Sequence, residues 1–168
     1  MMIVLRVVHI LLGVFWAGGA FFAAMFLVPS VRAAGPAGGP VMKQLMEVRK
    51  FPIYAMVFGL LTVISGLWMY FQDNSISGGV FAKSHAGMTY GLGAITAILT
   101  LVVGATIMGP TSGKMSKLMG QIATQGGPPT PEQQGMIKQL QERLGLGARL
   151  ASGLLLITVI TMAIGRYV

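Results

Sequence analysis

Four long stretches of this chain contain no Asp, Glu, Lys or Arg, and they restrict the fold more than any other feature. They are residues 7–31, 51–72, 84–112 and 150–165. A helix needs about 20 predominantly apolar residues to cross a bilayer. The fourth stretch is shorter, but Arg149 and Arg166 flank it with side chains long enough to reach the two interfaces. The sequence therefore predicts an all-α membrane four-helix bundle in one domain, with transmembrane helices at about 3–28, 52–71, 80–110 and 148–167.

The composition agrees with lipid as the main solvent. Only 10% of the residues are charged, against about 25% in a typical soluble domain. The net charge of +8 does not indicate nucleic acid, because the basic residues flank the apolar stretches instead of alternating with aromatic ones. The absence of cysteine excludes disulfides, thiolate metal sites, iron–sulfur clusters and cysteine nucleophiles. We expect the lipid bilayer, and not nucleic acid, as a partner.

The basic residues are divided unevenly between the two sides of the predicted bundle. The two long loops carry Arg32, Lys43, Arg49, Lys50, Lys114, Lys117, Lys138, Arg143 and Arg149. The other side carries only Arg6, Lys83 and Arg166. Loops rich in Lys and Arg stay in the cytoplasm. We therefore expect a multi-pass protein of the cytoplasmic membrane with both long loops inside and both termini outside.

The first long loop carries a helical signal of its own. Residues 41–48 have an apolar stripe at helical spacing. We expect this segment to extend helix 2 inward, with Pro52 tolerated as a kink or a register shift.

The second long loop contains a clear break followed by a helix start. Residues 126–129 read Gly-Gly-Pro-Pro, which interrupts a helix. Thr130 then supplies a cap, with Pro at the first helical position and Gln three residues after the cap. A helix from there to the end of the fourth stretch has about 36 residues, or about 54 Å. We expect helices 3 and 4 to extend into the cytoplasm as a hairpin over about 113–147.

The chain also repeats itself weakly. Residues 41–47 match residues 136–142, and residues 61–65 match residues 157–161, at offsets of 95 and 96 positions. Helix 2 then resembles helix 4, and helix 1 pairs with helix 3. The pattern predicts two pseudo-repeated helical hairpins related by an axis along the membrane normal.

The two histidines of the chain lie in helices 1 and 3, which run in the same direction. His9 is about two turns into helix 1. His85 is about two turns into helix 3 if that helix starts near residue 78 or 79. This places both imidazoles near the outer third of the bilayer at similar depth. Ionisable residues inside a membrane are costly and often functional.

Two imidazoles at one level can hold a haem from both sides, since neutral imidazole is a good ligand for iron. Small residues follow both histidines at four-residue spacing and would leave a slot for a flat ring. The predicted site for haem b comprises His9, His85, Gly13, Ala17, Trp16, Thr89 and Gly93, with Arg6 and Lys83 near the propionates.

Other interpretations of the same residues remain open. Small residues at this spacing also let membrane helices pack directly against each other. A lone histidine can simply bond a neighbouring hydroxyl or carbonyl. Copper handling at the outer face is an alternative, because Met88 lies one turn from His85 and the chain has 13 methionines. No Asp or Glu lies within a span, so proton-driven transport ranks below these.

Residues 9–19, His-Ile-Leu-Leu-Gly-Val-Phe-Trp-Ala-Gly-Gly, carry a family resemblance. They are similar to the first helix of copper-resistance protein D-like domains and of related four-helix proteins of bacteria. Residues 162–168 are similar to the last helix of these related four-helix proteins. The haem-binding, oxygen-independent protoporphyrinogen oxidase family begins with a similar helix. There an Arg-Leu-Phe stretch follows, whereas residues 27–30 here read Leu-Val-Pro-Ser, which argues against that activity. The resemblance implies a bacterial inner membrane and His9 as a ligand.

The function that these observations favour is a b-type cytochrome-like protein with one haem between His9 and His85, near the outer face. It would exchange electrons with quinone or with a membrane redox partner. The observations favour an electron-transfer or accessory subunit over a stand-alone enzyme. The alternatives are a non-catalytic accessory subunit of a larger membrane complex and copper handling.

Overall fold

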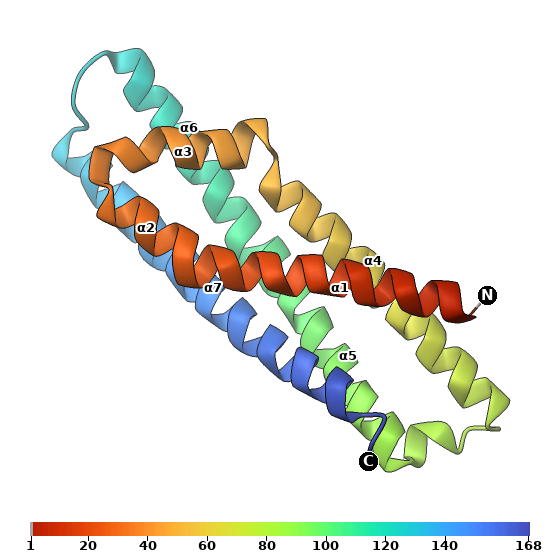
Figure 1. Cartoon of the computed structure of the whole chain (residues 1–168). Coiled ribbons are helices and arrows are strands. Elements are labelled where there is room, and N and C mark those ends of the chain that lie inside the picture. Colours follow the sequence, from red (N-terminus) through yellow and green to blue (C-terminus); the bar gives the residue numbers. More distant parts are fainter. Residues whose placement is uncertain (1) are drawn as a thin grey trace.

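The computed structural model describes residues 2–168, and the regular structure of this part is entirely helical (Figure 1). Four helices are long and apolar enough to cross a membrane, with lengths of 32, 26, 41 and 34 residues. They span Met2–Ala33, Phe51–Ile76, His85–Gln125 and Pro131–Ile164. These four helices confirm the prediction of a multi-pass, four-helix membrane protein as far as helix number, length and apolar character are concerned.

The first span consists of α1 (Met2–Phe22), a π-helical turn η1 (Ala23–Leu27) and α2 (Val28–Ala33). The π turn has a local cause in Pro29. Proline lacks an N–H, and its ring collides with the carbonyl four residues earlier. That carbonyl belongs to Met25, inside the wider turn, which absorbs the missing hydrogen bond and keeps the helix continuous.

The segment before α4 differs from the predicted inward extension of helix 2. It contains η2 (Gly35–Ala37), α3 (Gly38–Lys43) and a π turn η3 (Gln44–Val48), and it then breaks before α4 (Phe51–Ile76). Residues 41–48 are helical as predicted, but Lys50 takes a left-handed conformation with φ of 52°. The next residues belong to a new helix with a proline in its first turn. The chain breaks here instead of forming a kinked helix because Pro52 has no N–H that could donate a hydrogen bond to the preceding turn.

The third span starts later than predicted. A turn at Gly78 and Gly79, both with positive φ, leads into η4 (Phe81–Lys83), and α5 (His85–Val103) begins only at His85. Ser84 caps this helix by accepting a hydrogen bond from the N–H of Gly87 at 3.0 Å. His85 is therefore the first residue of its helix, and its predicted place two turns inside was wrong.

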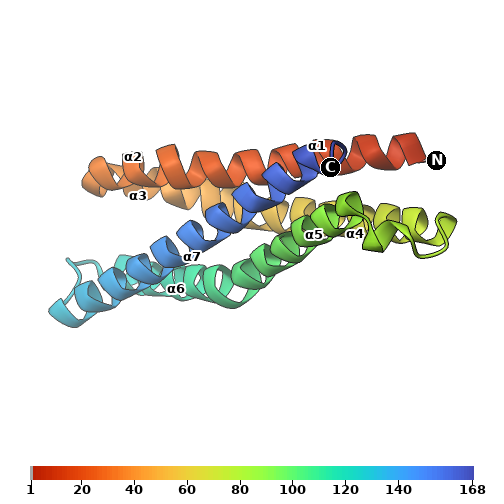
Figure 2. The same ribbon diagram turned by 90° about the horizontal axis from the view of Figure 1, so that it is seen from below.

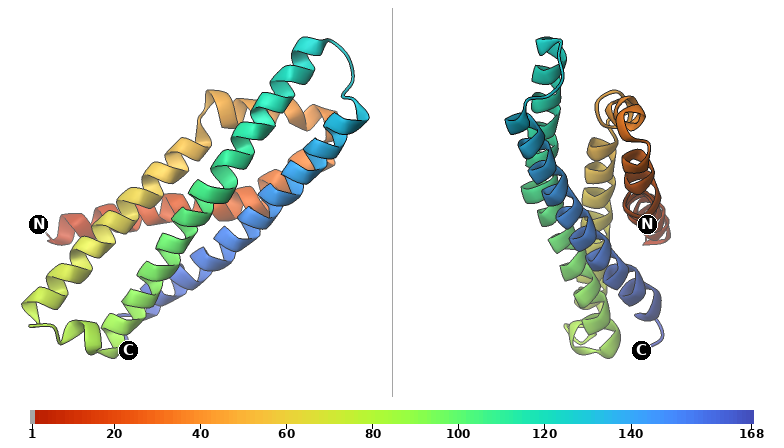
Figure 3. Two further views of the ribbon diagram at one scale, coloured as in Figure 1. Left: turned by 180° about the vertical axis from the view of Figure 1, so that it is seen from behind. Right: turned by 90° about the vertical axis from the view of Figure 1, so that its left-hand side faces the viewer.

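The third and fourth spans form a long hairpin. After α5 come the π turn η5 (Gly104–Met108) and α6 (Gly109–Gln125), and α7 (Pro131–Ile164) returns beside them. A 41-residue helix is about 60 Å long, which is twice the hydrocarbon thickness of about 30 Å. The predicted break at 126–129 is present, and Thr130 and Gln133 form the predicted capping box. Figure 3 shows the tip of this hairpin projecting at one end of the bundle.

The helices associate mainly in two antiparallel pairs, α1 with α4 and α5 with α7. Figure 2 shows α7 crossing the bundle at an angle to α1. The centre of the core is Trp16, Ala97 and Leu155, one residue each from α1, α5 and α7. Most large apolar side chains face outward instead, as expected of a protein whose surroundings are lipid.

Candidate functional site

His9 lies two turns into α1, as predicted, and its ring is held by α4. Nδ1 is 2.8 Å from the backbone oxygen of Thr62 and 3.2 Å from Oγ of Ser65. A carbonyl oxygen can only accept, so Nδ1 is the protonated nitrogen of the neutral imidazole. Nε2 then carries the free lone pair, and no described residue donates a hydrogen bond to it.

The residues of α4 in this contact leave space for the imidazole ring of His9. Ser65 donates its hydroxyl to the carbonyls of Leu61 at 2.7 Å and Thr62 at 3.0 Å, along its own helix. The next residue is Gly66, where a Cβ atom would lie 2.7 Å from Cε1 of His9. The imidazole therefore packs directly over the backbone of α4, in space that only glycine leaves open.

The contacts between α4 and α5 show how these two helices are aligned. A Cβ at Gly59 would lie 2.8 Å from the side chain of Leu101, and a Cβ at Gly91 would lie 3.6 Å from the hydroxyl of Tyr70. The helices are antiparallel, so one residue forward on α4 corresponds to one residue back on α5. Both contacts fit this single alignment.

This alignment separates the two histidines along the bundle axis. His9 is level with Gly66 of α4, and the α5 residue at that level is Ile95 or its neighbour. His85 lies ten residues earlier on α5, which is about 15 Å at 1.5 Å per residue. His85 is also exposed. The predicted matched depth was wrong, because it placed His85 two turns inside helix 3, whereas this helix begins at His85.

The small residues near the histidines are used for helix packing. A Cβ at Gly13 would lie 3.5 Å from Cγ2 of Thr62, and one at Gly93 would lie 2.6 Å from Oγ1 of Thr161. Ala17 is buried, and Thr89 donates its hydroxyl to the carbonyl of His85 at 2.8 Å. The expected slot for a flat ring is therefore filled by the neighbouring helix at both glycines, which is the close packing that small residues permit in membranes.

The remaining predicted site residues lie apart from the histidine contact. Trp16 is 7% exposed at the centre of the core, and a Cβ at Gly59 would lie 2.6 Å from its ring. Arg6 and Lys83 are exposed, on α1 and η4 respectively. Within residues 2–168, no three His, Cys, Asp or Glu side chains are grouped as metal ligands.

Sequence reasoning missed the α4 half of the site, namely Thr62, Ser65 and Gly66. The signal was present in the internal repeat, where Thr62 and Ser65 match Thr158 and Thr161. In the second pair of helices, the Thr158 hydroxyl lies 2.8 Å from that of Thr96 on α5. Hydroxyls three residues apart within a span thus face the partner helix in both pairs.

Comparison with known proteins gives no relative, since no protein-family model, curated protein or solved structure matches the chain. The resemblance of residues 9–19 to copper-resistance protein D-like domains and to the protoporphyrinogen oxidase family stays a prediction.

Proposed function

We propose that this chain is a membrane-embedded haem b protein that transfers electrons, and that His9 would be the residue that holds the haem. The observation that carries the proposal is the hydrogen bond from Nδ1 of His9 to the carbonyl of Thr62, at 2.8 Å. Metal-ligating histidines characteristically donate their second N–H to a carbonyl or carboxylate, which fixes the ring and makes the free nitrogen more basic. In His9 this hydrogen bond is made by Nδ1, which leaves the lone pair of Nε2 free for a ligand bond.

The residues present would supply one imidazole to a haem, and they do not fit a haem held between two histidines of the same chain. Two histidines of one chain that together held a haem would have to lie at nearly the same level in the bundle. His9 and His85 differ by about 15 Å in their level along the bundle. Only His9 would therefore hold the haem in this proposal. His85 is exposed and would not contact it. When bound, a haem would supply one-electron redox chemistry. The electrons would be exchanged with quinone or with a membrane redox partner.

The test is the absorption spectrum of detergent-purified protein, oxidised and reduced with dithionite. We expect a Soret band that is lost or shifted in His9→Ala and in Gly66→Ala, since the added methyl group meets the ring. The band should persist in His85→Ala and in Gly18→Ala, where the new Cβ has no neighbour within 4 Å. Absence of a Soret band after haem supplementation, or an unchanged band in His9→Ala, would contradict the proposal. Metal analysis of the same samples separates iron from copper.

We also propose the orientation that the charge asymmetry predicts, with both termini outside and the hairpin of α6 and α7 in the cytoplasm. The absence of cysteine makes this easy to test, because a single introduced thiol has no background. In intact cells, an impermeant maleimide should label Ser77→Cys and leave Gln125→Cys unlabelled until the membrane is permeabilised. The reverse pattern would invert the topology. The pseudo-repeat of two hairpins is supported by the pairing of α1 with α4 and of α5 with α7.

A second candidate function is a cofactor-free accessory subunit of a larger membrane complex. The closed packing at Gly13 and Gly93 favours it, because it leaves little interior room for a ring. The projecting hairpin would be the docking arm. A colourless protein that co-purifies with a stoichiometric partner, and loses that partner when residues 113–147 are shortened, would replace the haem proposal with this one.

A further inference from the structure

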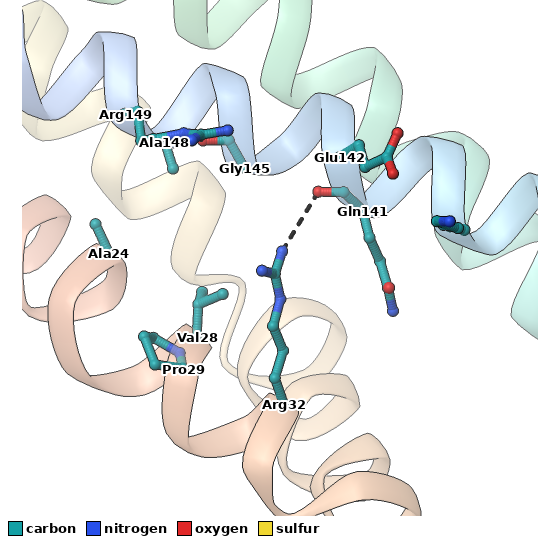
Figure 4. A pocket seen from close by; sticks show the side chains of 10 residues that line it. Ala24, Val28, Pro29, Arg32, Gln141, Glu142, Gly145, Ala148 and Arg149 are labelled. Atoms are coloured by element: carbon teal, nitrogen blue, oxygen red, sulfur yellow. Dashed lines mark hydrogen bonds between the residues drawn. The ribbon is translucent and has the colours of Figure 1, made fainter.

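A pocket of about 540 Å³ lies where the end of the first span approaches α7 (Figure 4). One wall comes from η1 and α2, and the other comes from residues 138–149 of α7. Its volume is within the range of sites that hold small organic groups. It is far from His9, which lies near the start of the first span, whereas the pocket residues lie near the end of that span.

The wall of the pocket that comes from the first span changes from apolar to charged along its length. Arg32 donates a hydrogen bond across it to the carbonyl of Gln141 at 3.4 Å, so these two residues are level with each other. Ala24 and Val28 lie two turns and one turn before Arg32, toward the membrane, and Ala148 lies on the facing side of α7. On this wall the apolar residues therefore lie toward the bilayer half of the helices, and Arg32 lies away from it.

Three cations and one carboxylate line the pocket. The cations are Arg32, Lys138 and Arg149, and the carboxylate is Glu142. Arg149 lies on α7 at about the level of Ala24, and its Nε donates to the carbonyl of Gly145 at 3.3 Å, one turn nearer to Arg32. Within the described part of the chain, neither guanidinium forms an ion pair. The excess positive charge is thus available to a ligand.

Gly145 makes room for this arrangement. A Cβ there would already lie 3.6 Å from Nη2 of Arg32, so a larger side chain would fill the space that the guanidinium uses. Figure 4 shows the Arg32 side chain reaching from α2 toward α7 across the opening.

We propose that this pocket binds the phosphodiester headgroup of an anionic phospholipid, with an acyl chain against Ala24 and Val28. Guanidinium groups bind phosphate oxygens through paired N–H donors, and basic pockets between membrane helices bind anionic headgroups. The apolar wall beside the cations favours a lipid over free phosphate. The proposal is independent of any haem at His9.

The experiment is native mass spectrometry of the full chain in detergent. The added probes are phosphatidylglycerol and phosphatidylcholine with identical acyl chains. We expect phosphatidylglycerol to be retained at least fivefold more than phosphatidylcholine. Arg32→Gln and Arg149→Gln should each reduce its retention about fivefold, as expected for one cation at a membrane surface. Lys114→Gln and Lys117→Gln on α6 remove the same charge outside the pocket and should change retention less than about twofold.

Several results would overturn the proposal. Equal retention of the two lipids, or equal losses in the pocket variants and the α6 controls, would show a general charge effect. Displacement of phosphatidylglycerol by millimolar inorganic phosphate would identify a site for soluble anions. If Arg32→Gln does not fold, as judged by gel filtration, Arg32→Lys should keep the charge and most of the retention, and loss of retention in this folded variant would also contradict a headgroup site.

Discussion

Gly66→Ala is the most informative perturbation of the contact between α1 and α4. The new Cβ would lie 2.7 Å from Cε1 and 3.2 Å from Nδ1 of His9. Contacts this short force the ring to move, and α4 cannot yield because the obstructing atom is attached directly to its backbone. Overpacking of this kind costs about 1–3 kcal/mol. Displacement of the ring also removes the bond to Thr62, and a hydrogen bond between membrane helices contributes about 0.6 kcal/mol on average.

The assay is thermal unfolding in detergent, followed by tryptophan fluorescence. Gly18→Ala on α1 is the matched control, because its Cβ meets no atom within 4 Å. We expect Gly66→Ala to unfold at lower temperature than both the parent and this control. In a His9→Ala background the same change should be nearly neutral, since the obstructing ring is gone. If Gly66→Ala is as stable as Gly18→Ala, or if removing the imidazole does not relieve its effect, the proposed packing of His9 over α4 is incorrect.

Three further changes test other parts of the fold. Gly59→Ala should destabilise more than Gly66→Ala, because its Cβ would meet the buried ring of Trp16 at 2.6 Å; equal melting temperatures would argue against that packing. Thr96→Val removes the 2.8 Å hydroxyl contact with Thr158, and thermal unfolding should show a loss of only about 0.6 kcal/mol. Thr130→Ala removes the capping box and should weaken the start of α7 by about 1 kcal/mol, measured as faster amide exchange there and unchanged exchange at the core.

The presence of four long apolar helices was predictable because charge-free length is a property of the sequence alone. The start of α7 was also predictable, since Thr130, Pro131 and Gln133 form a local signal that needs no tertiary contact. The start of α5 was not. Nothing in the apolar pattern distinguishes residues 80–84 from a helix, and the decision depends on Ser84 capping the N–H of Gly87.

The candidate site was predictable only on one side. His9 stands out as an ionisable residue in an apolar stretch. Its partners on α4 are a backbone carbonyl, a hydroxyl and a glycine, and these are common in membrane helices. Which of them face α1 depends on how the two helices are aligned, and that alignment is set by packing. The matched depth of His9 and His85 was wrong because α5 begins at His85, six or seven residues after the expected start at residue 78 or 79, a difference of about 10 Å along the helix.

The continuous 41-residue helix from His85 to Gln125 has a mechanical consequence. A hydrogen-bonded helix is stiff along its axis. A displacement of its capped end at Ser84 therefore also displaces the tip of the hairpin. Bending concentrates at the wider turn η5 (Gly104–Met108), where the regular ladder is interrupted. The loop at 126–129 is therefore the place where a distance reporter would register movement at the far end of the molecule.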